Sequence, residues 1–143
     1  MNRIMTTMAL IILQYTSALA DQATLEKAVP ADIEGYQSET EEATDSKLVR
    51  WFEGKNDQYI VVEIDFGGQL VAAMRNTFHA MKLGMDTVEI NQETYVYDGE
   101  MFSLLVEREI LVRAYGTAPK NDVESMLRQL NVAALKELAV SSQ

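Results

Sequence analysis

The chain has 143 residues, contains no cysteine and carries a formal net charge of −10. The lack of cysteine excludes disulfides, a catalytic thiol and a thiolate metal site. The acidic balance argues against nucleic acid and anionic lipid surfaces as partners, because their phosphates attract Lys and Arg. It permits a basic partner or cations.

The first twenty residues have the three parts of a secretory signal peptide. Arg3 supplies a positive charge, residues 4–13 are mostly apolar, and residues 18–20 form a small-x-small cleavage site. Polar residues interrupt the apolar stretch, which favours a cleaved signal over a membrane anchor of about 20 apolar residues. We therefore expect cleavage after Ala20, a periplasmic or secreted bacterial location, and a single domain over residues 21–143 with no membrane span.

The predicted domain begins with a short helical segment that Pro30 ends. Residues 33–36 could begin a first strand. Residues 37–47 are rich in carboxylates and poor in large apolar side chains, which fits either an exposed loop or a strand at a sheet edge. The acidic part, Glu39 to Asp45, lacks the ligand spacing of a calcium loop, so we interpret it as a solvated charge run.

Two strands and a helix follow. Residues 47–53 predict one strand, and residues 59–66 predict another because apolar and polar side chains alternate there. After Gly67 and Gly68 the apolar spacing changes to three and four, which predicts an amphipathic helix up to residue 85. Its sheet-facing stripe is expected to comprise Leu70, Met74, Thr77, Phe78, Met81 and Met85, with Arg75, Asn76, His79 and Lys82 opposite.

The last third predicts four short strands and a helical end. The strands cover residues 87–90, 93–97, 101–106 and 110–115. Asn121 and Glu124 resemble a capping box at the start of a helix that Asn131 interrupts. The order of elements predicts an α+β fold: an antiparallel sheet of about six to seven short strands with two main helices packed on it.

The sequence offers little for metal binding or catalysis. His79 is the only histidine. The thioethers of Met74, Met81 and Met85 suit Cu(I), but their helical spacing favours a role in filling the core. No serine lies in a G-x-S-x-G elbow, and no apolar setting marks one carboxylate as a general acid. We therefore predict no metal site, no cofactor, no catalytic residues and no enzymatic activity.

Aromatic side chains in the predicted strands are the candidate binding residues. If helices leave the second face of the sheet bare, these rings form an exposed patch, which is typical of binding surfaces. The alternative is cross-strand pairing that only stabilises the sheet. The candidates are Trp51, Tyr59, Tyr95, Tyr97 and Tyr115.

A loose motif near the start of the domain carries a resemblance to a family. Leu25, Val29-Pro30, Ile33, Gly35 and Tyr36 follow the pattern Leu-Pro-x-x-(aliphatic)-x-Gly-(Trp or Tyr), with Val29 in place of the usual leucine. The chain thereby resembles an uncharacterised family of exported bacterial α+β domains, and its architecture is similar to PsbP-like sandwiches. The resemblance implies a binding or accessory role and supplies no catalytic residues.

We expect a small soluble exported protein that binds an unknown partner and performs no chemistry. One alternative is an acidic inhibitor or immunity protein for a basic enzyme, whose association would be electrostatically steered. The other is a periplasmic carrier of a small apolar ligand held between sheet and helix. Its cavity would be lined by Met74, Phe78, Met81, Val62 and Ile64.

Overall fold

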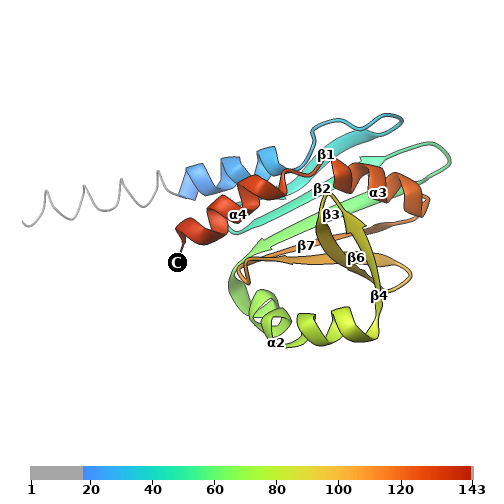
Figure 1. Ribbon diagram of the computed structural model, residues 1–143. Helices are drawn as coiled ribbons and strands as arrows, with labels where there is room; N and C mark the ends of the chain where they lie inside the picture. The colour runs from blue at the N-terminus through green and yellow to red at the C-terminus, as the bar shows by residue number, and fades with distance from the viewer. Residues whose placement is uncertain (1–17, 143) are drawn as a thin grey trace, which may run out of the picture.

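The computed structural model describes residues 18–142, so most of the predicted signal peptide lies outside the described residues. The fold is built on one seven-stranded antiparallel sheet with the strand order β1-β2-β3-β7-β6-β5-β4 (Figure 1). This arrangement confirms the predicted α+β class. The strands are β1 (Gln37–Ala43), β2 (Lys47–Glu53), β3 (Tyr59–Phe66), β4 (Asp86–Ile90), β5 (Glu93–Tyr97), β6 (Met101–Val106) and β7 (Ile110–Gly116).

Helices lie on both sides of the sheet. An N-terminal helix over residues 18–28, α3 (Lys120–Arg128) and α4 (Val132–Ser141) lie over one face, which we call the covered face (Figure 1). Helix α2 (Gly68–Gly84) lies on the opposite side, which we call the open face. Within residues 18–142, no helix combines the length and apolarity that crossing a membrane requires.

The main core lies between the covered face and its three helices. Alternate side chains of β2 and β3, among them Phe52, Ile60 and Ile64, are fully buried there. The helices contribute Leu25, Met126 and Leu135, among others. Because the chain has no disulfide, this apolar burial is the main source of stability.

Arg50 is a charged residue inside this apolar layer. It lies in β2 on the covered face and is only 7 % exposed. Its guanidinium donates from Nη1 to the carbonyl oxygens of Val29 at 2.8 Å and Glu26 at 3.1 Å, and from Nε to Thr40 Oγ1 at 3.1 Å. Burial lowers the pKa of Arg50, and the nearby Glu26 carboxylate opposes that effect. Arg50 thus satisfies the orphan carbonyls at the end of the N-terminal helix and ties them to the sheet.

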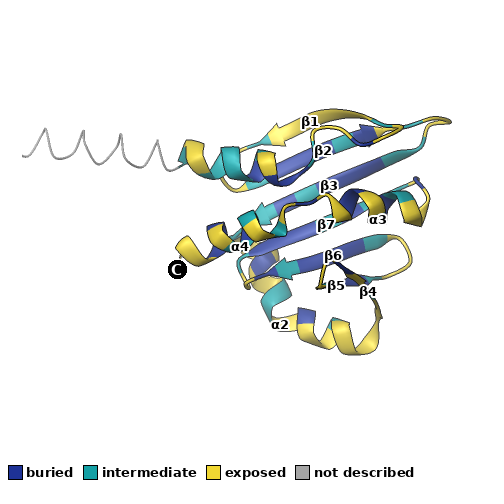
Figure 2. Ribbon diagram, turned by 45° about the horizontal axis from the view of Figure 1, so that its top comes forward, coloured by how far each residue is buried: buried dark blue, intermediate teal, exposed yellow. Residues whose placement is uncertain are grey.

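The predicted orientation of α2 is only partly right: of the expected stripe, Phe78 is buried and Met74 and Met81 are partly buried. Its buried residues are Val71 and Phe78, whereas Leu70, placed in the predicted stripe, is 41 % exposed. Arg75, predicted to point away from the sheet, is partly buried and pairs with Glu109 at 2.8 Å. The helix contacts the sheet along a narrow line, and most of its surface is exposed (Figure 2). The helix thus buries a narrower part of its apolar stripe than predicted, and Arg75 lies beside that part.

The two C-terminal helices are separated as predicted, but the N-cap of the first one is not the predicted residue. The N-cap of α3 is Pro119 and not Asn121, and it makes no side-chain capping bond. Asn131 does interrupt the helical segment, because its side chain accepts a hydrogen bond from the Ala134 amide at 3.1 Å and so begins α4. This is the usual chemistry of an asparagine N-cap.

Candidate functional site

The open face of the sheet is only partly covered. Helix α2 packs against β3, β5, β6 and β7, and the edge strand β1 is exposed along almost its whole length (Figure 2). The acidic segment of residues 37–47, predicted as a loop or an edge strand, therefore contains the edge strand. Several side chains on the open face of β1, β2 and β3 consequently meet solvent, whereas Val49 and Val61 are buried there.

Three of the predicted aromatic residues meet on this face. Trp51 lies opposite Val61 in the β2–β3 ladder, and Val61 lies opposite Tyr115 in the β3–β7 ladder. The rings of Trp51 and Tyr59 are 5.1 Å apart between centroids and tilted by 33°. Val61 is fully buried beside them, while the three rings are half-buried. We call Trp51, Tyr59 and Tyr115 the aromatic strip.

Carboxylates frame the aromatic strip. Glu39 lies opposite Trp51 in β1, and Glu53 lies opposite Tyr59 in β2. A bulge in β1 at Glu41 accompanies a hydrogen bond from Trp51 Nε1 to the Glu41 carboxylate. Burial raises the pKa of Tyr115, the carboxylates of Glu63 and Glu41 raise it further, and the Arg113 guanidinium opposes them. The strip therefore lies in a negative electrostatic environment.

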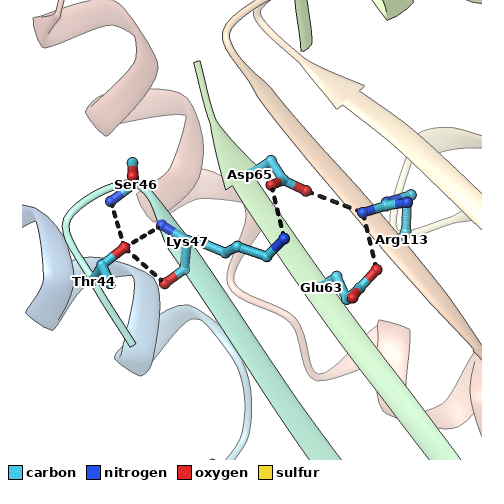
Figure 3. A network of polar contacts seen from close by, with 6 residues as sticks. All are labelled: Thr44, Ser46, Lys47, Glu63, Asp65 and Arg113. Carbon is cyan, nitrogen blue, oxygen red and sulfur yellow. Dashed lines mark hydrogen bonds and ion pairs between the residues drawn. The ribbon is translucent and has the colours of Figure 1, made fainter. Parts of the chain in front are cut away.

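A ladder of ion pairs continues along the open face from the strip (Figure 3). Arg113 Nη2 lies between Glu63 Oε2 at 2.9 Å and Asp65 Oδ2 at 3.2 Å, and Lys47 Nζ lies 3.6 Å from Asp65 Oδ1. These four side chains neutralise one another. Among the described residues, the frame carboxylates of Glu39, Glu41 and Glu53 have no such ion pair, so the negative charge concentrates at the strip.

A pocket of about 320 Å³ adjoins the strip at one end of the sheet. Tyr59 and Tyr115 form part of its wall, and Tyr97 and Lys120 form another part. Lys120 Nζ lies 4.5 Å from the centre of the Tyr97 ring, which is a cation–π contact within the molecule. We call this the end pocket.

The structure places the other two predicted binding residues differently. Tyr95 is 1 % exposed and belongs to the covered-face core, and burial raises its pKa. This placement corrects the expectation that Tyr95 contributes to an exposed patch. Tyr97 stacks on Phe102 at 4.5 Å and packs against the same core. It reaches the strip only through the end pocket.

The residues considered for metal binding do not gather. His79 is exposed on α2, and Met85 is 36 % exposed beyond its end. Across residues 18–142, no three His, Asp or Glu side chains are grouped so as to hold a metal ion. Met74 and Met81 are partly buried, so the expected core-filling role applies to them only in part.

Ring faces edged by carboxylates attract ammonium and guanidinium groups through cation–π and charge-assisted contacts. Comparisons with family models, with curated proteins and with solved structures give no match for the chain. The geometry of the aromatic strip and its carboxylates suits a cationic ligand.

Proposed function

We propose that the chain is an exported, non-enzymatic binding module that takes a positively charged partner segment on its aromatic strip. The observation that carries this proposal is the set of half-exposed rings framed by carboxylates of Glu39, Glu41 and Glu53. Aromatic pairing alone would stabilise the sheet equally well with neutral neighbours. The acidic frame supports a binding role because it adds selectivity for Lys and Arg.

The expected strength follows from the contacts available. One cation over an exposed ring contributes about 0.5–1 kcal/mol, and one exposed ion pair contributes about 0.2–1 kcal/mol. Over three rings and three carboxylates these contacts sum to at most about 6 kcal/mol, so only a segment that places several cations on the strip approaches the roughly 8 kcal/mol of a micromolar complex. The partner is therefore a basic, multivalent segment and not a single amine, and its binding weakens with salt.

The burial pattern of the N-terminal helix is compatible with cleavage after Ala20. Leu19, just before the proposed cleavage site, is 48 % exposed, whereas Leu25, Ala28 and Val29 are in the core. Cleavage after Ala20 would keep every one of these core residues. We propose that the domain of residues 21–143 acts beyond the inner membrane.

The two alternatives fare differently. An acidic inhibitor or immunity protein for a basic enzyme is one form of the proposed function, with the enzyme as the cationic partner. The apolar carrier loses its cavity, because Val62 and Ile64 belong to the covered-face core. Phe78 and the methionines of α2 lie on the opposite side of the sheet, so the two sets do not line one space.

The proposal is tested by titrating a fluorescently labelled peptide of alternating lysine and serine and following its polarisation. We expect saturable binding that weakens about fivefold in the Glu39→Gln/Glu41→Gln variant, since each of the two lost ion pairs costs about 0.5 kcal/mol. The control is Glu137→Gln, an exposed carboxylate of α4, which should bind like the wild type. Equal binding by all three proteins would refute the proposal.

A further inference from the structure

A second pocket is lined mainly by basic side chains, although the molecule as a whole is acidic. It measures about 260 Å³ and lies between α2 and the turn that joins β6 to β7. The chain has 22 acidic and 12 Lys and Arg residues, yet the lining of this pocket has four side chains with basic nitrogens and one carboxylate. It is lined by Arg75, Phe78, His79, Lys82, Leu105, Glu107 and Arg108. Helix α2 itself has no acidic residue.

The turn that supplies one wall is held in a disfavoured backbone conformation. Glu107 has φ 49° and Arg108 has φ 62°, both in the left-handed region. Asparagine and glycine adopt this region most readily, and the chain uses Asn91 first in the corresponding β4–β5 turn. Two long charged residues are a costly choice for such a turn. Strain of this kind gathers at functional positions, and here it places Arg108 at the pocket.

Arg75 fixes this wall without remaining available to a ligand. Its Nε donates to the Arg108 carbonyl oxygen, and its Nη2 donates to Glu109 Oε2 at 2.8 Å. Arg75 is thus a positioning residue that holds the turn against α2. Lys82 Nζ lies 5.6 Å from the Phe78 ring centre. Within residues 18–142, neither Lys82 nor Arg108 takes part in an ion pair.

We propose that this pocket binds a phosphate group. Arg108 provides a planar fork of donors, Lys82 a compact charge, and His79 a ring N–H, and together they can surround a tetrahedral anion. The volume of about 260 Å³ accepts the group with part of the molecule that bears it. The phosphate group belongs either to an ester in solution or to a lipid headgroup. For a lipid, Leu83, which follows Lys82 and is 78 % exposed, would supply an apolar contact. This site is independent of the aromatic strip.

The test is a titration of the isotope-labelled protein with inorganic phosphate at constant ionic strength, followed by amide chemical shifts. We expect saturable shifts confined to residues 78–83 and 105–109. Lys82→Gln should weaken binding by about tenfold, as expected for a lost charge-assisted contact. Arg128→Gln, an exposed arginine of α3, is the control and should bind phosphate like the wild type.

Arg108→Asn separates the ligand role from a structural one. Asparagine tolerates the left-handed region, so this variant should melt at a higher temperature than the wild type and yet bind phosphate about tenfold more weakly. Vesicles of phosphatidylcholine with and without phosphatidylglycerol then identify the bearer: binding only to the anionic vesicles assigns a lipid headgroup, and binding to neither assigns a soluble ester. Shifts that do not saturate, or that persist unchanged in Arg108→Asn, would overturn the proposal.

Discussion

Replacing Arg50 by methionine removes the guanidinium that joins the N-terminal helix to the sheet and keeps much of its apolar stem. Two carbonyl oxygens lose donors at 2.8 and 3.1 Å, and each hydrogen bond from a charged group is worth about 1.5–3 kcal/mol. The methionine recovers part of this because the buried guanidinium no longer has to be desolvated. We expect a net loss of about 2–4 kcal/mol in the free energy of unfolding.

Urea denaturation followed by circular dichroism measures this loss. With a slope of about 1–3 kcal/mol per molar urea, the midpoint should fall by roughly 1–2 M. The matched control is Arg128→Met, because Arg128 is 56 % exposed and its nearest carboxylate oxygen is 3.7 Å away. That change should cost no more than about 0.5 kcal/mol. Equal midpoints for Arg50→Met and Arg128→Met would refute the role assigned to the buried guanidinium.

Two further predictions concern the β3–β7 ladder and alkaline pH. Gly116 has φ 147°, and a Cβ there would lie 2.1 Å from the Tyr59 carbonyl oxygen, so Gly116→Ala should destabilise the fold by about 2 kcal/mol or more. Gly84→Ala meets open space at the end of α2 and should stabilise it by up to about 1 kcal/mol; thermal melts that rank the two variants in the reverse order would contradict this. The pKa of Tyr36 is raised from 10.0 to about 12 by burial and by its hydrogen bond to Asp122. Since the folded state disfavours the ionised phenol, stability should fall between pH 10 and pH 12, and a Tyr36→Phe variant with an equally steep fall would argue against this cause.

Local patterns in the sequence were enough to define most of the sheet. The apolar residues within 47–53 and the alternation over 59–66 predicted β2 and β3 with their observed bounds, because both patterns are local properties of a strand. The partly buried position of Arg75 on α2 could not be predicted in this way. Its partner Glu109 lies 34 residues further along the chain.

The residues of the candidate site were also predictable only in part. Trp51, Tyr59 and Tyr115 were identified from their place in the strands, and strand register brings them together. Tyr95 was misassigned because only the packing of α3 and α4 decides which sheet face is covered. The acidic frame was missed for a related reason, since the β1 bulge that accompanies the contact of Glu41 with Trp51 leaves no mark in the sequence pattern.

Trp51 is the only tryptophan of the chain, so its fluorescence reports directly on the aromatic strip. The decisive measurement follows its emission during a titration with the unlabelled lysine–serine peptide, alongside a glutamate–serine peptide of equal length. We expect the basic peptide alone to change the emission saturably, at the same concentrations that saturate the polarisation signal. Unchanged Trp51 emission under a saturated polarisation curve would place the partner elsewhere and contradict the account.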